Sequence, residues 1–259
     1  METGILQVVG IGPGSYEMMT IQCVKALENC DCIIGYEVYT NLVKEHFPQK
    51  EFKSTSMRKE EGRCRLAVEE ASKGKSVALI CSGDCGVYGM AGLIYEIAAE
   101  YESSSGRKIQ ISIIPGITAA LSGGAVLGAP LIHDFCVISL SDLMTPWEKI
   151  EKRLEAAASA DFCAVLYNPM SHKRIDYLFK ACKIFLKNRS ENQPCAYVRN
   201  IGREGEEYKI LSLKELAESE LDMFCTVFIG NSQTRILEIN GEKKLVTPRG
   251  YVFETRHSS

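Results

Sequence analysis

The sequence of 259 residues has few histidines and no marked excess of either charge. Lys and Arg number 30 against 33 Asp and Glu, which gives a formal net charge of −3. This balance provides no global attraction to nucleic acid or to an anionic membrane surface. The histidines show none of the spacings of metal ligands; they are His46, His133, His172 and His257. We therefore expect no nucleic-acid partner and no metal ligands.

Segments that would export or anchor the chain are also lacking. The start before Ile5 has neither the cationic nor the apolar region of a secretory signal. The longest stretch without charged residues, 109–132, is long enough to span a bilayer, but glycines and prolines interrupt it between Pro115 and Pro130. This composition favours a buried strand, a turn and a helix of small residues. We expect a cytoplasmic protein that does not insert into membranes.

Several common catalytic motifs are missing. A Gly-x-Ser-x-Gly elbow, which hydrolases use, does not occur. Gly74-Lys75-Ser76 resembles the end of a phosphate-binding loop, but Glu69 stands where that motif needs glycine. Gly10-Ile11-Gly12-Pro13-Gly14 is followed by Ser15 instead of the third glycine of a dinucleotide fingerprint. Hydrolases, nucleoside triphosphate enzymes and nicotinamide or flavin enzymes are therefore disfavoured.

Cysteine, by contrast, is abundant, with eleven residues, although no pair has the C-x-x-C spacing. Cys30 with Cys32, or Cys81 with Cys85, could contribute to a metal site or a cluster, but neither pair has a matching second half. Buried, reduced thiols are the simpler interpretation for a chain without a secretion signal.

Short apolar runs alternate with longer amphipathic segments, which predicts the α/β class. We expect strands at 5–9, 32–34, 77–80, 109–114, 135–140, 162–166, 194–198, 208–211 and 225–229, and helices at 21–27, 63–72, 90–100, 117–127, 147–158 and 175–187, with a capping box at Ser212 and Glu215. Many of these strands are continuously apolar, as in a parallel sheet covered on both faces. Gly123 to Pro130 is the best boundary, which gives domains 1–130 and 131–259 with a cleft between them.

Three expected strands end in similar loops. The first is followed by Gly10 to Ser15, the second by Cys81 to Gly89, and the third by Pro115 to Ala120. Glycines at such exits leave the backbone bare at the carboxyl ends of strands, where open α/β sheets bind ligands. Asp84 adds a negative charge that suits a cationic ligand, although it could instead cap the next helix. Thr118 could likewise cap its own helix or donate to a ligand.

Two strands of the second half end in asparagine. Tyr167-Asn168-Pro169 follows one strand and Arg199-Asn200-Ile201 follows another. A side-chain amide can both donate to and accept from a purine edge, so these positions could complete an adenosyl site. Each of them, taken singly, is also compatible with an ordinary turn.

Read together and in order, these segments resemble the tetrapyrrole methylase family of S-adenosylmethionine-dependent enzymes. The three strand-end loops look like the three loops of that family, with Cys85 where the family commonly has proline. Further segments look like its precorrin-3B C(17)-methyltransferase branch; they are 35–39, 87–92, 128–135, 138–143, 145–147, 167–169, 230–234 and 247–251. The resemblance covers nearly the whole chain.

The resemblance implies a two-domain class III methyltransferase fold that binds S-adenosylmethionine in its inter-domain cleft and releases S-adenosylhomocysteine. By position, the residues implied to line the methyl-donor site are Pro13, Ser82, Gly83, Asp84, Val87, Thr118, Ala119, Tyr167, Asn168, Asn200 and Ile201.

The implied reaction methylates carbon 17 of precorrin-3B, or of its cobalt form, with contraction of the ring. Methyl transfer needs alignment more than a nucleophilic side chain, whereas contraction can use acid/base groups. Candidates for that catalytic role are Tyr36, Tyr88, His133, Ser141 and Asp142. Basic residues that could meet the substrate carboxylates are Arg58, Lys59, Arg63, Arg65, Arg174, Arg199 and Arg203. The cysteine content weakly favours the cobalt form, since thiols tolerate an anaerobic cytoplasm.

The partners implied are a tetrapyrrole and a second copy of the chain, because the family likeness and the small net charge favour a homodimer. Two alternatives stay open. One is a different methylase of the same fold, for uroporphyrinogen C(2)/C(7), RNA or a translation factor. The other is a corrinoid-binding carrier without catalysis.

Overall fold

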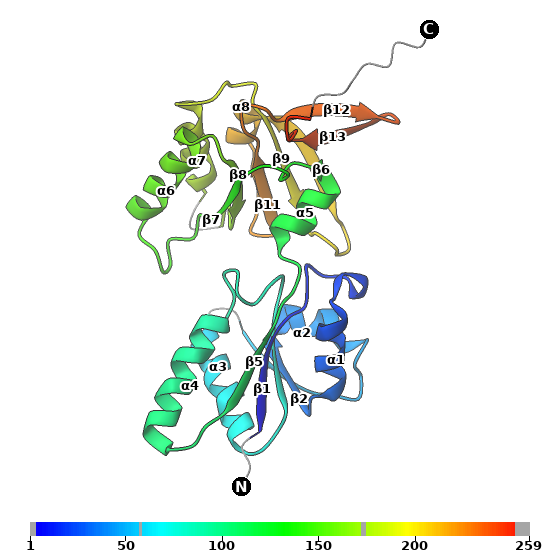
Figure 1. The fold of residues 1–259 in the computed structure, drawn as a ribbon, viewed down its shortest axis with the longest axis vertical. Coiled ribbons are helices and arrows are strands. Elements are labelled where there is room, and N and C mark those ends of the chain that lie inside the picture. Colours follow the sequence, from blue (N-terminus) through cyan, green and yellow to red (C-terminus); the bar gives the residue numbers. More distant parts are fainter. Residues whose placement is uncertain (1–3, 57–58, 172–174, 252–259) are drawn as a thin grey trace. The chain divides into compact units, whose positions relative to one another are not determined.

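The computed structural model describes residues 4–56, 59–171 and 175–251. It divides into two compact units, 1–119 and 120–259, which we call unit 1 and unit 2 (Figure 1). The expected boundary at residue 130 falls after helix α5 (Ala119–Leu127), nearly all of which belongs to unit 2. Domain limits at 1–130 and 131–259 stay a prediction.

Unit 1 is built on a five-stranded parallel sheet in the order β3-β2-β4-β1-β5. Its strands are β1 (Ile5–Gly10), β2 (Cys32–Tyr36), β3 (Glu51–Thr55), β4 (Val77–Cys81) and β5 (Gln110–Ile114). Its helices are α1 (Ile21–Asn29), α2 (Glu37–Lys44), α3 (Glu60–Ser72) and α4 (Ala91–Ser105), with a 3₁₀ turn at Tyr16–Met18. The expected parallel sheet is confirmed here, and it puts every strand's carboxyl end at one edge.

Helices cover both faces of this sheet, which explains the continuously apolar strands. Alternate strand residues such as Val8 and Leu79 pack with α3 and α4. Their neighbours, such as Val9 and Ile80, pack with α1 and α2 on the other side (Figure 1).

Unit 2 has a mixed sheet in the order β10-β9-β11-β8-β7, and in this respect the expectation of parallel strands is wrong. Among the described pairs of this five-stranded sheet, only β7 and β8 run parallel, and the other pairs are antiparallel. Its strands are β7 (Phe135–Ser139), β8 (Cys163–Tyr167), β9 (Pro194–Arg199), β10 (Glu207–Ser212) and β11 (Cys225–Ile229). Its other helices are α6 (Trp147–Ser159), α7 (Tyr177–Leu186) and α8 (Leu213–Ala217). Burial on both faces makes antiparallel strands as apolar as parallel ones, so composition alone did not separate the two arrangements.

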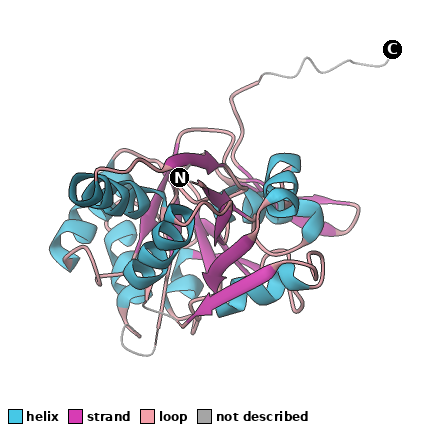
Figure 2. Cartoon of the chain, turned by 90° about the horizontal axis from the view of Figure 1, so that it is seen from below, coloured by secondary structure: helices cyan, strands magenta, loops and turns pink. Residues whose placement is uncertain are grey.

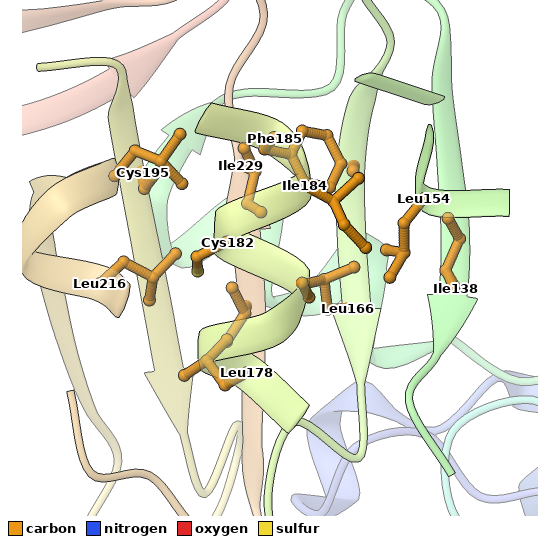
Figure 3. Packing of buried hydrophobic residues seen from close by; sticks show 14 of the residues in the cluster. Ile138, Leu154, Leu166, Leu178, Cys182, Ile184, Phe185, Cys195, Leu216 and Ile229 are labelled. Atoms are coloured by element: carbon orange, nitrogen blue, oxygen red, sulfur yellow. The ribbon is translucent and has the colours of Figure 1, made fainter. Parts of the chain in front are cut away.

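The main core of unit 2 lies between one face of this sheet and α6, α7 and α8 (Figure 3). Leu166 and Ile229 from the sheet meet Leu178 and Phe185 from α7 there. Helix α5 packs elsewhere in the unit, where a side chain at Gly123 would approach Phe228 to 2.9 Å. The capping box of α8, with Ser212 and Glu215, is confirmed.

A small sheet completes unit 2, in the order β12-β13-β6. Its strands are β6 (Gly128–Ala129), β12 (Arg235–Ile239) and β13 (Glu242–Val246). Asn240 and Gly241 both have positive φ angles, 54° and 78°, which is the geometry of a type I′ hairpin turn. Figure 2 distinguishes the helices and strands from the loops that connect them.

All eleven cysteines are unpaired, and all except the half-buried Cys136 are buried, which confirms the expectation of buried thiols. Among the residues described, no helix is both long and apolar enough to cross a membrane.

Candidate functional site

Strands β4, β1 and β5 are neighbours in unit 1, so the three glycine-rich loops that follow them meet at the carboxyl edge of the sheet. Gly12 and Gly83 exchange two backbone hydrogen bonds, at N···O distances of 3.1 and 2.7 Å. Gly116 is pressed against both other loops, because a Cβ there would lie 2.1 Å from the Gly83 carbonyl oxygen and 2.7 Å from the Gly10 carbonyl oxygen. The loops therefore contact one another through bare backbone, and no other residue type fits at Gly116.

Asp84 connects two of these loops through its carboxylate. Its Oδ1 accepts from the Gly86 amide at 2.7 Å, and its Oδ2 accepts from the Gly116 amide at 2.8 Å. The alternative that Asp84 caps the next helix is wrong, because α4 begins at Ala91 with Met90 as its N-cap. Asp84 holds the loop after β4 against the loop after β5 and stays partly exposed.

Cys85 also holds the loop after β4 in place. Its thiol is fully buried and lies 3.4 Å from the Val8 carbonyl oxygen and 3.3 Å from that of Ile114. Burial raises the pKa of the Cys85 thiol to about 11, so it stays protonated and can donate. The thiol therefore ties this loop to β1 and β5.

The other unit 1 residues expected at the site lie along the same edge. Pro13 is buried, while Ser82, Val87, Thr118 and Ala119 are partly exposed. The two candidate tyrosines are there as well. Tyr36 ends β2 with its ring edge-on to that of Tyr39 at 5.1 Å. Tyr88 is 58% exposed and has a φ of 53°, which is strained for a residue with a bulky side chain.

Three of the seven basic residues expected to meet substrate carboxylates have partners for their side chains within the chain. Arg63 is only 3% exposed; its guanidinium donates to Thr55 Oγ1 at 2.8 Å and to the Ser56 carbonyl, so this expectation is wrong for Arg63. Arg65 pairs with two glutamates on the helix surface, and Arg199 pairs with Asp222 at 2.9 Å. Arg58 and Arg174 lie outside the described residues.

In unit 2, β7 and β8 end side by side, and side chains connect the loops that follow them. The Tyr167 hydroxyl accepts from the Ala120 amide, in the first turn of α5, at 2.7 Å. Asn168 has a φ of 53° and donates through Nδ2 to Ser139 Oγ at 3.0 Å. Ser139 Oγ also accepts from the Ser141 amide at 3.2 Å. Ser139 thus joins a residue expected to bind the methyl donor to a candidate catalytic residue.

Asn200 and Ile201 follow β9. Asn200 has a φ of 52°, and its backbone amide donates to the Phe224 carbonyl oxygen at 3.3 Å. Ile201 is buried, and its Cδ1 lies 3.0 Å from where a Gly123 side chain would begin. Ile201 therefore packs against α5.

The candidate catalytic residues of unit 2 fall at two opposite ends of β7. Ser141 and Asp142 follow its carboxyl end, whereas His133 precedes its amino end. A strand of five residues separates them by about 16 Å at 3.3 Å per residue. The His133 ring accepts from the neighbouring Asp134 amide at 2.9 Å. Within unit 2, the structure does not bring His133 together with Asp142.

Sequence reasoning missed Tyr177, whose hydroxyl donates to Asp142 Oδ2 at 2.7 Å. Its ring lies 4.5 Å from that of Trp147. Tyr177 and Asp142 are far apart in the sequence, and only the pairing of β7 with β8 brings the segments that follow these strands together. Nothing in the local pattern around Tyr177 signals this contact.

The described residues contain no group of three or more His, Cys, Asp or Glu side chains that could hold a metal ion. Two of the segments typical of the branch, 230–234 and 247–251, contribute to a buried polar network instead. Thr247 Oγ1 lies 2.7 Å from both Thr234 Oγ1 and the Pro130 carbonyl oxygen. The Cys163 thiol lies 3.4 Å from the same Thr247 oxygen. These segments stabilise unit 2.

Comparison with solved structures defines the class of protein. A structure titled "Crystal structure of the methyltransferase CobJ" is similar over 95% of this chain and 100% of that one, with 32% identity and a TM-score of 0.84. Cobalt precorrin-4 methyltransferase CbiF shares the fold, with 22% identity over 87% of this chain and 94% of that one and a TM-score of 0.71. The fold is that of the class III methyltransferases.

Residues 6–217 match the family described as Tetrapyrrole (Corrin/Porphyrin) Methylases. The chain belongs to this family, and it is an S-adenosylmethionine-dependent methyltransferase. It is 42% identical over 249 residues to the probable cobalt-factor III C(17)-methyltransferase of Salmonella typhimurium, with 96% of this chain and 100% of that one aligned. It is 44% identical over 248 residues to the cobalt-factor III methyltransferase of Priestia megaterium, where 96% of this chain spans 45% of that protein.

Proposed function

We propose that this chain methylates carbon 17 of cobalt-factor III or of the metal-free precorrin-3B, with contraction of the ring, in cobalamin biosynthesis. The observation that carries the proposal is the end-to-end likeness to relatives of the same length. The Salmonella relative aligns over its whole length, and the probable cobalt-factor III C(17)-methyltransferase of Methanocaldococcus jannaschii aligns over 98% of its length at 40% identity. Both names specify the carbon that is methylated.

The strand-end loops of unit 1 suit the methyl donor. When bound, S-adenosylmethionine supplies a methyl group that its sulfonium already makes electrophilic. The loops meet through the backbone of Gly12 and Gly83, and beside this contact the partly exposed carboxylate of Asp84 favours a cationic ligand. Their mutual hydrogen bonds fix this surface before the ligand arrives, which lowers the entropic cost of binding.

The residues of this chain have to align the methyl group with the ring carbon and exclude water. Of the residues that the sequence predicts to bind the donor, we leave out Ile201, which is buried against α5. We assign donor binding to the others, which are Pro13, Ser82, Gly83, Asp84, Val87, Thr118, Ala119, Tyr167, Asn168 and Asn200. Acid/base work in ring contraction falls to Tyr36, Tyr88, Ser141 or Asp142, which all lie at or after the carboxyl ends of strands.

We further propose a cytoplasmic homodimer. The support for association is the apolar surface of β12, where Ile236, Leu237 and Ile239 are exposed on an edge strand. Light scattering at micromolar concentration should give the mass of a dimer. A monomeric mass would remove this part of the proposal.

Turnover tests the main proposal. The protein is incubated with methyl-labelled S-adenosylmethionine and, separately, cobalt-factor III, precorrin-3B and uroporphyrinogen III. We expect one methyl group to be added to the first or second substrate, with loss of the porphyrinoid absorbance as the ring contracts. Methylation of uroporphyrinogen III alone would assign another step of the pathway. Tight binding of the tetrapyrrole without methyl transfer would identify a carrier.

A further inference from the structure

The loop between β7 and α6, residues 140–146, combines an anchored acid with an exposed apolar tip. Asp142 is partly buried, whereas Leu143 and Met144 directly after it are 60% and 95% exposed. Two adjacent apolar side chains pointing into solvent are costly unless a ligand or partner covers them.

This loop is anchored at its tip by α7. Tyr177, the first residue of α7, donates its hydroxyl hydrogen to Asp142 Oδ2 at 2.7 Å. The Tyr177 ring packs against Trp147, the first residue of α6, at a centroid distance of 4.5 Å. Lys180 Nζ lies 5.1 Å from the Tyr177 centroid and is held by Asp176 at 2.6 Å. The Tyr177 hydroxyl is therefore fixed by its ring and does not depend on Asp142 for its position.

The base of the loop is anchored by Asn168, which directly follows β8. Ser139 Oγ accepts both from the Ser141 amide and from the side-chain amide of Asn168. Asn168 is a proposed contact of the methyl donor. The same hydrogen-bonded network thus connects the donor residue Asn168 with the loop that carries Asp142.

We infer that loop 140–146 is the surface of unit 2 that contacts the tetrapyrrole, and that Tyr177 is the positioning residue that aims Asp142 at it. This inference rests on the proposed function. A tetrapyrrole has a wide apolar face, which Leu143 and Met144 would cover. The Asp142 carboxyl would hold or accept a proton, while the hydrogen bond from Tyr177 to Oδ2 sets its position.

Hydrogen bonding to a carboxylate favours its ionised form. The Tyr177 hydroxyl faces Asp142, and the ammonium of Lys180, which Asp176 balances, lies near the tyrosine ring. Loss of the tyrosine hydroxyl should therefore make Asp142 easier to protonate and harder to aim, with the ring packing unchanged.

The test replaces Tyr177→Phe, with Tyr208→Phe on β10 as the matched control. We expect kcat for tetrapyrrole methylation and contraction to fall about tenfold in Y177F, with KM for S-adenosylmethionine unchanged and the acid limb of the pH–rate profile moved to higher pH. Y208F should match the wild type. The double variant Y177F/D142N should be no slower than D142N alone, because Tyr177 acts through Asp142. Equal thermal midpoints would show that the folds are comparable.

A Y177F enzyme with wild-type kcat and pH profile, or additive effects in the double variant, would overturn the inference. A second measurement does not need turnover. Absorbance titration with the tetrapyrrole should show weaker binding by Leu143→Ser and Met144→Ser, and unchanged binding by Ile21→Ser, an exposed residue of unit 1. Unchanged binding by both loop variants would also overturn it. Failure of the proposed function is distinct, since the wild type would then methylate neither cobalt-factor III nor precorrin-3B.

Discussion

The two units assemble their strand ends by different means. In unit 1 the loops after β1, β4 and β5 contact one another through glycine backbone, with Gly12 bonded to Gly83 and Gly116 in contact with both other loops. In unit 2 the loops after β7 and β8 are joined by side chains, from Asn168 to Ser139 and from Tyr177 to Asp142.

Because of this difference, we expect substitutions to be tolerated poorly at the strand-end surface of unit 1 and better at that of unit 2. Backbone contacts between glycines leave no room for a Cβ, so the unit 1 edge tolerates few substitutions at these positions. Side-chain hydrogen bonds in unit 2 can be removed one at a time, at a net cost of about 1 kcal/mol each. We propose that the first arrangement serves the common methyl donor and that loop 140–146, within the second, serves the particular tetrapyrrole.

The largest effect is expected from Gly116→Ala. Its Cβ would lie 2.1 Å from the Gly83 carbonyl oxygen, and the three nearest atoms all belong to the backbone, which cannot move away as a flexible side chain can. We expect a loss of roughly 3–5 kcal/mol in the free energy of unfolding, measured by urea denaturation. Gly92→Ala in α4 is the matched control, because no atom lies within 4 Å of its Cβ position. It should stabilise the helix by about 0.5–1 kcal/mol. Equal effects of the two variants would contradict the backbone contact.

Arg189→Met tests how strongly a buried side chain holds unit 2 at the other end of its sheet. Arg189 is 3% exposed and donates to the carbonyls of Gly230 and Phe162. Methionine keeps much of the volume but leaves two carbonyls without this donor, so we expect a loss of about 2–3 kcal/mol. Lys187→Met, at an exposed ion pair with Glu155, should change stability by less than about 0.5 kcal/mol. A similar small effect at Arg189 would show that side chains contribute little to unit 2.

Asp84→Asn examines the exception in unit 1, where one side chain connects two glycine loops. An amide offers one acceptor oxygen, so either the Gly86 or the Gly116 amide loses its partner. We expect the affinity for S-adenosylhomocysteine to fall about tenfold, or 1.4 kcal/mol, by calorimetry. The control is Asp31→Asn, since Asp31 accepts from the Ser76 amide just before β4, at the opposite edge. If D84N and D31N both bind like the wild type, the carboxylate is not needed to shape the site.

The smallest effect concerns pH and the amino edge of the unit 1 sheet. Hydrogen bonds from Lys53, Lys73 and Lys75 hold the pKa of the buried Glu70 well below its usual range. The stabilisation is therefore complete above the ordinary glutamate pKa of about 4.3 and declines as the pH falls below it. The free energy of unfolding should drop more steeply between about pH 5 and 3 in the wild type than in Glu70→Gln. If stability depended on pH in the same way in both proteins, ionised Glu70 would not be a source of this stabilisation.

The sequence was sufficient for most of the fold because apolar runs define the core strands of both sheets. It missed α2, β3, β6, β12 and β13. Strand β3 lies on a sheet edge and is polar at every position except Phe52, and β6 has only two residues. The hairpin of β12 and β13 could have been found from Asn240-Gly241, a strong turn signal.

The candidate site was predictable where it depends on local backbone. The three glycine loops were expected at strand ends, and the strand order brings them together. Side-chain contacts between residues distant in sequence were not predictable. The strand order of the unit 1 sheet brings Asp84 to the Gly116 amide, and the pairing of β7 with β8 in unit 2 brings Tyr177 to Asp142. His133 was grouped with Asp142 from the sequence, whereas β7 lies between them.

Amide hydrogen exchange with and without S-adenosylhomocysteine tests most directly the claim that the glycine loops of unit 1 form the methyl-donor surface. The account predicts slower exchange on ligand binding in peptides that cover residues 10–15, 82–89 and 115–120. Peptides at the amino edge of the same sheet, around Lys73 to Ser76, should exchange at unchanged rates. Protection confined to that opposite edge, or binding without any change in the three loops, would contradict the account.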